Sequence, residues 1–117
     1  MWTSLYPIHQ GLGHLLSALS LIAVVCAIVL AIKDIDEYRP TSIFFSIVVG
    51  LLDLQILLGL IGYAMIGLAT VSTYHPVLAI LAAIAFHSGK KMKRWKRVAG
   101  FLLGTVCIVG AVMLAVV

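Results

Sequence analysis

Residues 15–32 read LLSALSLIAVVCAIVLAI, and none of these 18 side chains carries a charge. A transmembrane α-helix needs about 20 consecutive, mostly apolar residues to cross the hydrocarbon core of a bilayer. Together with the apolar residues before it, this run predicts a membrane-spanning helix over residues 5–32. The helix is expected to end at the sequence KDIDEYRP, residues 33–40, because its charged side chains are too costly to place in lipid.

Three further hydrophobic runs follow and predict helices over residues 41–69, 73–89 and 98–117. The run over 73–89 is the shortest, and it reaches membrane length only if the residues at both of its ends are included. A short connection, Thr70–Thr73, joins the second and third helices, which we expect to form a tight antiparallel pair. The sequence therefore predicts an all-α integral membrane four-helix bundle, with residues 1–117 forming a single domain.

The composition of the 117-residue chain also favours a membrane location, since 63% of its residues are hydrophobic, only 10% are charged and the mean hydropathy is +1.20. A soluble domain of this size could not bury so many apolar side chains, so we expect contact with the lipid bilayer. The net charge of +4 does not predict nucleic-acid binding, because six of the eight basic residues are concentrated between Lys90 and Arg97.

The basic residues predict how the helices are oriented. Lys33 and Arg39 lie in the first connection, and the other six lie in the third. The N-terminal segment, the second connection and the C-terminus contain no Lys or Arg. Because connections rich in Lys and Arg stay on the cytoplasmic side, we expect the first and third connections inside and both termini outside.

Ionisable side chains within membrane spans are costly, so each is a functional candidate. His9, His14 and Asp53 lie inside the predicted helices, and His75 and His87 lie near the ends of the third. Imidazole is a good ligand for iron, zinc and copper, and histidines on facing helices of a bundle can hold haem as axial ligands. A haem site is therefore one hypothesis for these histidines.

The depth of each histidine indicates which two form a pair. The first and third helices both begin on the outer side and descend by about 1.5 Å per residue. His9 lies about four residues into the first helix and His75 about three into the third, so both are expected at a similar depth. His87 is expected about 18 Å lower, beside the basic connection. We therefore predict that His9 and His75 ligate haem b, with His87 and His14 as secondary ligand candidates.

Small residues near these histidines would let a flat cofactor lie against the backbone. The residues expected to line the haem site, besides the histidines, are Gly13, Gly59, Gly62, Tyr63 and Ala79. Small residues also mark places where helices pack closely in lipid, and this is the more common reason for them. Gly100 and Gly104 are interpreted in this second way.

Asp53 lies near the middle of the predicted span, about 12 residues into the second helix, and His14 lies at a similar depth in the first. We predict that they form a pair, since pairing lowers the cost of placing either group in lipid. Such a pair is a structural tie, part of a proton path, or a support that orients a ligating imidazole. Gln55 is expected to join the same network.

The second and third helices carry a recognisable pattern. Residues 50–63 read GLLDLQILLGLIGY, and they are followed by HPVLA at 75–79 and AFHSGKK at 85–91. This pattern resembles that of small bacterial four-helix membrane proteins, in which a histidine opens the first helix, Asp-Leu-Gln lies in the second, and His-Pro and a terminal histidine bracket the third. These proteins are similar in architecture to membrane b-type cytochromes.

The resemblance implies haem binding and a multi-pass location in the bacterial inner (cytoplasmic) membrane. By this likeness, His9 matches the histidine of the first helix, and His75 and His87 match those of the third. His14 has no counterpart, because a large apolar residue is more usual at its position. The role of His14 is therefore open.

A bound haem would make the chain an electron carrier, with a quinone or a periplasmic redox protein as its partner. We expect a homo-oligomer or a subunit of a larger redox complex. The sequence shows no nucleophile–base pair and no Walker-type glycine loop, which favours an electron carrier over a classical enzyme. The alternatives are a small proton-coupled transporter, in which Asp53 would carry the proton, and a cofactor-free structural membrane subunit.

Overall fold

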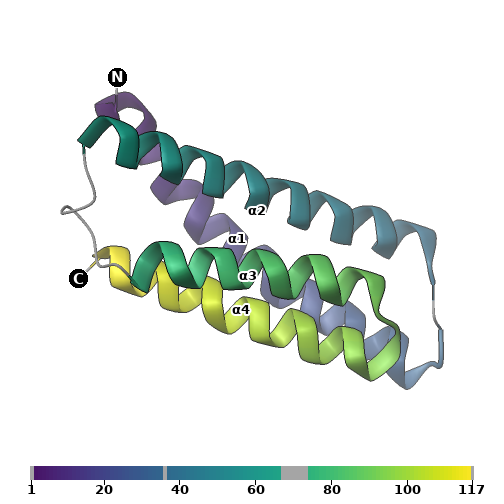
Figure 1. Ribbon diagram of the computed structural model, residues 1–117. Helices are drawn as coiled ribbons and strands as arrows, with labels where there is room; N and C mark the ends of the chain where they lie inside the picture. The colour runs from purple at the N-terminus through teal and green to yellow at the C-terminus, as the bar shows by residue number, and fades with distance from the viewer. Residues whose placement is uncertain (1, 36, 67–73, 117) are drawn as a thin grey trace.

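The computed structural model describes residues 2–35, 37–66 and 74–116, and the regular structure within these ranges is entirely α-helical. The helices are α1 (Trp2–Ile32), α2 (Arg39–Ile66), α3 (Tyr74–Lys91) and α4 (Arg94–Val116). They lie along one long axis in a bundle of 47 × 22 × 18 Å, with both termini at the same end (Figure 1). The predicted all-α class and its four helices are confirmed.

The helix bounds differ from the predicted ones mainly at the third connection. Helix α3 continues to Lys91, and α4 begins at Arg94 instead of Val98. The chain therefore reverses over only Met92 and Lys93, and most of the predicted basic loop is helical. Residues 67–69 of the predicted second helix and the connection Thr70–Thr73 lie outside the described residues.

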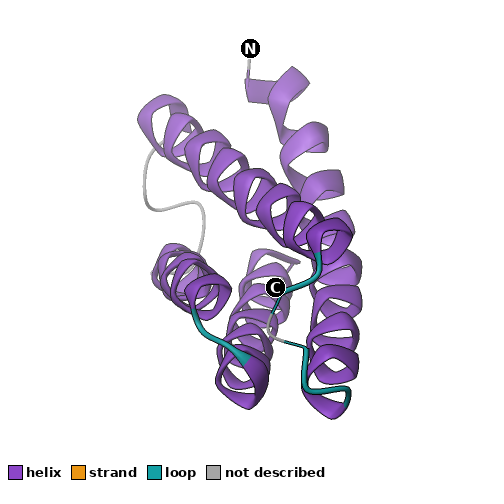
Figure 2. Ribbon diagram, turned by 90° about the vertical axis from the view of Figure 1, so that its right-hand side faces the viewer, coloured by secondary structure: helices purple, strands orange, loops and turns teal. Residues whose placement is uncertain are grey.

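Each helix packs against two neighbours, so that the bundle is a closed ring in the order α1, α2, α3, α4 (Figure 2). The contact between α3 and α4 is the most extensive of the four, and the contact between α2 and α3 is the least extensive. Helix α3 is therefore held mainly by α4. The seam between α2 and α3 is the most open side of the ring.

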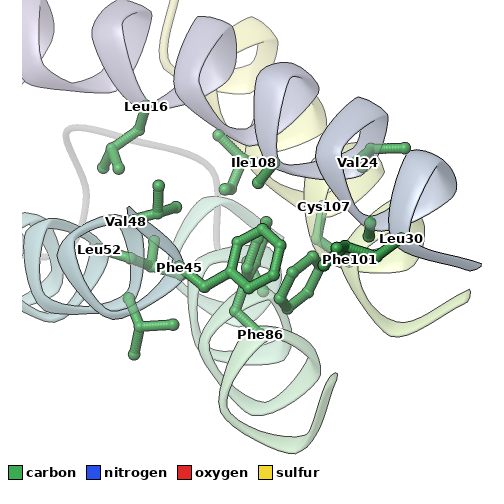
Figure 3. Packing of buried hydrophobic residues seen from close by; sticks show 14 residues of the cluster. Leu16, Val24, Leu30, Phe45, Val48, Leu52, Phe86, Phe101, Cys107 and Ile108 are labelled. Carbon is green, nitrogen blue, oxygen red and sulfur yellow. The ribbon is translucent and has the colours of Figure 1, made fainter. Parts of the chain in front are cut away.

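Three aromatic rings from three helices form the centre of the core near the end that carries the short connections (Figure 3). The rings of Phe86 (α3) and Phe101 (α4) are stacked, with centroids 5.0 Å apart. The ring of Phe45 (α2) meets Phe101 edge to face at 4.8 Å. Aromatic pairs of this kind contribute about 0.5–1.5 kcal/mol beyond the burial of their area, so this cluster joins α2, α3 and α4.

Glycines allow α3 and α4 to approach backbone to backbone beside these rings. A Cβ atom at Gly100 would lie 2.9 Å from Cα of Gly89 and 3.3 Å from the carbonyl oxygen of Ala85. A Cβ atom at Gly104 would collide with the ring of Phe86. The interpretation of Gly100 and Gly104 as a close-packing pair is thus confirmed, since close approach of helix backbones requires residues without side chains.

Arg97 is the exception among the basic residues, because only 6% of it is exposed. Its guanidinium carbon lies 5.5 Å from the centroid of the Phe45 ring, and its Nε donates a hydrogen bond to the carbonyl oxygen of Met92 at 3.0 Å. A cation over an aromatic face is attracted to the negative π-cloud. Arg97 therefore connects the turn between α3 and α4 to the aromatic core.

The first connection begins with a well-formed helix end. Asp34 has a φ of 59°, its amide donates to the carbonyl of Ala31, and the amide of Ile35 donates to that of Leu30. These two bonds are those of a Schellman motif, and Ile35 also packs against the hydrophobic core, as the motif favours. The Asp34 carboxylate lies 3.3 Å from the guanidinium of Arg94, so the first and third connections meet at one end of the bundle.

Within the described residues, three helices are long and apolar enough to cross a membrane, over Tyr6–Ile32, Arg39–Gly62 and Arg94–Met113. Helix α3 has 18 residues and ends in two lysines, and it is not among these three helices. Large apolar side chains are exposed on all four helices, including Ile32, Ile47, Ile84 and Val106. Apolar surface of this extent is typical of contact with lipid or with another protein.

The close approach of α3 and α4 predicts the effect of a single methyl group. The variant Gly100→Ala should destabilise the bundle by about 1–3 kcal/mol, because the new Cβ forces two backbones apart in a packed core. The measurement is the unfolding midpoint in detergent.

Gly11→Ala is the matched control, because no atom lies within 4 Å of a Cβ placed at Gly11. This variant should be neutral or stabilising by up to about 1 kcal/mol, since Ala is the better helix former. Equal destabilisation by both variants would contradict the close contact between the backbones of Gly100 and Gly89.

Candidate functional site

A cleft lies at the end of the bundle that carries the termini, and side chains from all four helices line it. The lining residues are Tyr6, His9, Gln10, Gly13 and His14 from α1, Gln55 from α2, His75 from α3 and Val112 from α4. We call it the histidine cleft. It brings together several polar side chains from helices that are otherwise mostly apolar. Convergent polar groups in a cleft are the usual sign of a binding site.

His9 and His75 face each other across this cleft. Their ring centroids are 6.2 Å apart, and the ring planes are nearly perpendicular, at 86°. The two residues come from α1 and α3, which are not neighbours in the ring of helices. The structure thus brings together the two histidines that were paired by their depth in the sequence, while their role as ligands stays a prediction.

The ring of His75 is fixed by α4. Its Nδ1 lies 2.7 Å from the carbonyl oxygen of Ala111. Because a carbonyl oxygen can only accept a hydrogen bond, Nδ1 must carry the proton. Neutral imidazole then has its lone pair on Nε2, which is the nitrogen left to bind a metal or accept another hydrogen bond. Backbone support of the non-ligating nitrogen is common for histidine ligands of metals.

Helix α2 approaches His9 from the other side. The Nε2 of Gln55 donates to the backbone carbonyl oxygen of His9 at 2.6 Å, which joins α1 to α2 inside the cleft. A Cβ atom at Gly59 would lie 3.4 Å from Cε1 of His9, and one at Gly13 would lie 3.2 Å from Nε2 of Gln55. Gly13 and Gly59 therefore give the Gln55 and His9 side chains the space they occupy.

The other residues predicted for the site have different positions. Gly62 is buried in α2 and Ala79 is half-buried on α3, and neither is among the residues that line the cleft. The side chain of Tyr63 lies outside the described part of the structure. Tyr6 and Gln10 line the cleft but were not predicted, although their spacing of four residues, with Gly13 three further on, marks one face of a helix.

His14 does not pair with Asp53, which corrects the sequence-based prediction. It lines the same cleft as His9 and His75, and its side chain is exposed. Five residues along a helix turn a side chain by about 140°, so His9 and His14 do not share one face. Both nevertheless line the same cleft.

Asp53 pairs with His87 instead. The Nε2 atom of His87 lies 3.0 Å from both carboxylate oxygens of Asp53, and half of each side chain is exposed. His87 lies four residues before Lys91, the last residue of α3, so it is near the basic connection as expected. Its contact with Asp53 was not expected, and it forms because α2 has 28 residues and α3 only 18, so that the middle of α2 lies level with this part of α3. Asp53 therefore orients His87 and has no hydrogen bond to the cleft histidines.

Among the described residues, no three His, Cys, Asp or Glu side chains lie close enough together to share a metal ion. The cleft offers two facing imidazoles, and the α2–α3 seam offers one imidazole with one carboxylate. The chain matches no family model, no curated protein and no solved structure. The chemistry of the cleft is therefore inferred from its own geometry.

The hydrogen bonds of the two α3 histidines predict opposite tautomers. Neutral His75 should carry its proton on Nδ1, which donates to Ala111, and neutral His87 should carry its proton on Nε2, which donates to Asp53. Nitrogen chemical shifts of the ¹⁵N-histidine-labelled protein in detergent measure both. A proton on Nε2 of neutral His75 would show that the Ala111 contact does not form.

Proposed function

We propose that the chain is an integral membrane protein that binds a b-type haem between α1 and α3 through His9 and His75 and transfers electrons. The observation that carries the proposal is the pair of imidazoles that face each other in the histidine cleft, 6.2 Å apart. His9 comes from α1, which is long and apolar, and His75 comes from the first turn of the shorter helix α3.

The membrane part of the proposal places all four helices across the bacterial inner membrane. Three helices have the required length and apolar composition, and α3, with 18 residues, is about 27 Å long at 1.5 Å per residue. The basic residues gather at the end of the bundle where the Asp34–Arg94 ion pair lies. We assign this end to the cytoplasm, and the termini and the histidine cleft to the outer side.

The number of ligands supports haem over a bare metal ion. A zinc ion in a protein is held by at least three side chains, and two imidazoles without a third ligand are a weak site. A haem supplies four nitrogens of its own and needs only two axial ligands from the protein. His9 and His75, with ring centroids 6.2 Å apart, are the two residues that would hold the haem.

A haem in the cleft requires side chains to change position. The space beside Gly13 and Gly59 is occupied by the side chains of Gln55 and His9, whose Nε2 and Cε1 atoms lie 3.2 and 3.4 Å from Cβ atoms placed at these glycines. The cleft is narrow, so a planar macrocycle requires the other lining side chains to move outward. Of these, Tyr6, Gln10 and His14 are exposed.

When bound, haem supplies a one-electron redox couple. The residues of the chain hold and orient it. His75, fixed by Ala111, presents Nε2 as a ligand, and the hydrogen bond from Gln55 to the carbonyl of His9 holds α1 and α2 together beside the second ligand. The partner would be a quinone or a periplasmic redox protein, with the chain acting as a homo-oligomer or within a larger membrane complex.

Proton-coupled transport has less support from the contacts of Asp53. A transporter needs its proton-binding carboxylate beside a path through the protein. Asp53 lies instead on the α2–α3 seam with half of its side chain exposed, and it is not among the residues that line the histidine cleft. A cofactor-free structural subunit is the competing hypothesis, and the absorption spectrum separates it from a cytochrome.

The purified protein should show a Soret band that shifts on reduction with dithionite, together with the split visible bands of bis-histidine haem. His75→Ala should abolish this spectrum, because it removes the ligand that α4 holds in place. His14→Ala is the matched control and should leave the spectrum largely unchanged. Helix content, measured by circular dichroism, verifies that each variant is folded.

Two results would refute the proposal. A folded, colourless protein that takes up no added haemin would favour the structural subunit. Loss of the spectrum in His14→Ala alone, with the spectrum retained in His75→Ala, would show that the proposed ligand pair is wrong.

A further inference from the structure

The short turn between α3 and α4 carries a concentrated positive charge. Five basic side chains in and beside it are exposed, and we call this set the basic turn: Lys90, Lys91, Lys93, Arg94 and Lys96. Neither α3 nor α4 contains an Asp or Glu residue. Arg94 is paired with Asp34 of the first connection, whereas within the described residues none of the four lysines forms an ion pair with a carboxylate. The charge of the basic turn is therefore largely unbalanced within the described part of the chain.

The fold holds these charges close together. The chain reverses over only Met92 and Lys93, and the amide of Met92 donates a hydrogen bond to the carbonyl oxygen of Gly89 at 3.0 Å. The carbonyl oxygen of Met92 in turn accepts the hydrogen bond from the buried Arg97. Like charges held near one another repel, and basic side chains in the first turn of α4 also oppose the dipole of that helix. A bound anionic group would offset both of these costs.

An apolar surface begins directly beside the basic turn. Trp95 lies among the basic residues in the sequence and is 57% exposed. Ala99, Leu102 and Val106 follow it at helical spacing along one face of α4, and all are exposed. We call these four residues, Trp95 included, the α4 stripe. In a bilayer, Trp side chains prefer the level of the lipid headgroups, and this preference would place the basic turn at the same level.

We propose that the basic turn binds an anionic phospholipid, whose phosphate group contacts the lysines and whose acyl chain lies along the α4 stripe. Lysine ammonium groups donate strong, charge-assisted hydrogen bonds to phosphate oxygens. Clusters of about four to eight basic residues at the cytoplasmic end of a membrane helix attract anionic lipids. The inference rests on the membrane part of the proposed function, which assigns this end of the bundle to the cytoplasm, and it is independent of haem binding.

A phospholipid matches both parts of this surface. Its charged headgroup and its apolar chain are joined in the order in which the basic turn and the α4 stripe follow each other along the chain. From Trp95 to Val106 the stripe extends about 16 Å at 1.5 Å per residue, which is close to half of the hydrocarbon core of about 30 Å. A free phosphate ion or an acidic peptide would match the lysines alone.

Tryptophan fluorescence tests this site, because Trp2 and Trp95 are the two tryptophans of the chain. The full chain with Trp2→Phe is reconstituted in vesicles of equal parts phosphatidylcholine and phosphatidylglycerol, with quenching bromine atoms on the acyl chains of one lipid or of the other. Brominated phosphatidylglycerol should quench Trp95 more strongly, by an amount that corresponds to about fivefold enrichment of the anionic lipid. Trp95→Phe is the matched control. Trp2 begins α1 at the opposite end of the bundle, where the sequence has no Lys or Arg, and the two lipids should quench it nearly equally.

Removal of the lysine charges makes a second prediction. In the Trp2→Phe background, the combined variant Lys90→Gln, Lys91→Gln, Lys93→Gln and Lys96→Gln should lose the enrichment, while both lipids still quench Trp95. Helix content, measured by circular dichroism, verifies that this four-lysine variant is folded.

Three results would overturn the proposal. They are equal quenching of Trp95 by the two lipids, the same enrichment at Trp2 as at Trp95, and unchanged enrichment in the four-lysine variant. The first of these would favour an acidic protein as the partner of the basic turn. An absence of quenching by either lipid would also contradict the membrane location, whereas haem content, measured on the same samples, reports separately on the histidine cleft.

Discussion

The backbone contact between α3 and α4 is the constraint on which the rest of the bundle depends. Helix α3 is the shortest and most polar of the four, and its packing against α4 is the most extensive contact in the ring. Gly89 and Gly100 meet backbone to backbone, and the rings of Phe86 and Phe101 stack beside them. This close packing against α4 is the main contact that holds α3 in place.

This contact also sets the positions of both polar pairs. Helix α3 carries a histidine near each end, and α4 fixes the height of the helix in the bundle. His75 then hydrogen-bonds to Ala111 and faces His9 of α1, while His87 reaches Asp53 of α2. A single helix thus provides the partner for the histidine cleft and for the surface pair. The proposed haem site therefore depends on the placement of α3.

Some of these features could be predicted from the sequence because they depend on local chemistry. Helix number follows from the apolar runs, and the pairing of His9 with His75 follows from the rise of a helix. The partner of Asp53 could not be predicted in this way, because it depends on how far α2 extends beyond α3. The burial of Arg97 was also missed, since a basic run indicates a solvated surface unless an aromatic ring such as Phe45 lies within reach.

Electron paramagnetic resonance of the oxidised, purified protein tests the central claim that His9 and His75 share one haem iron. We predict about one iron per chain and a low-spin ferric signal. Each of the variants His9→Ala and His75→Ala should remove this low-spin signal. A high-spin signal in the unmodified protein, or the absence of haem iron from the folded protein, would contradict bis-histidine ligation.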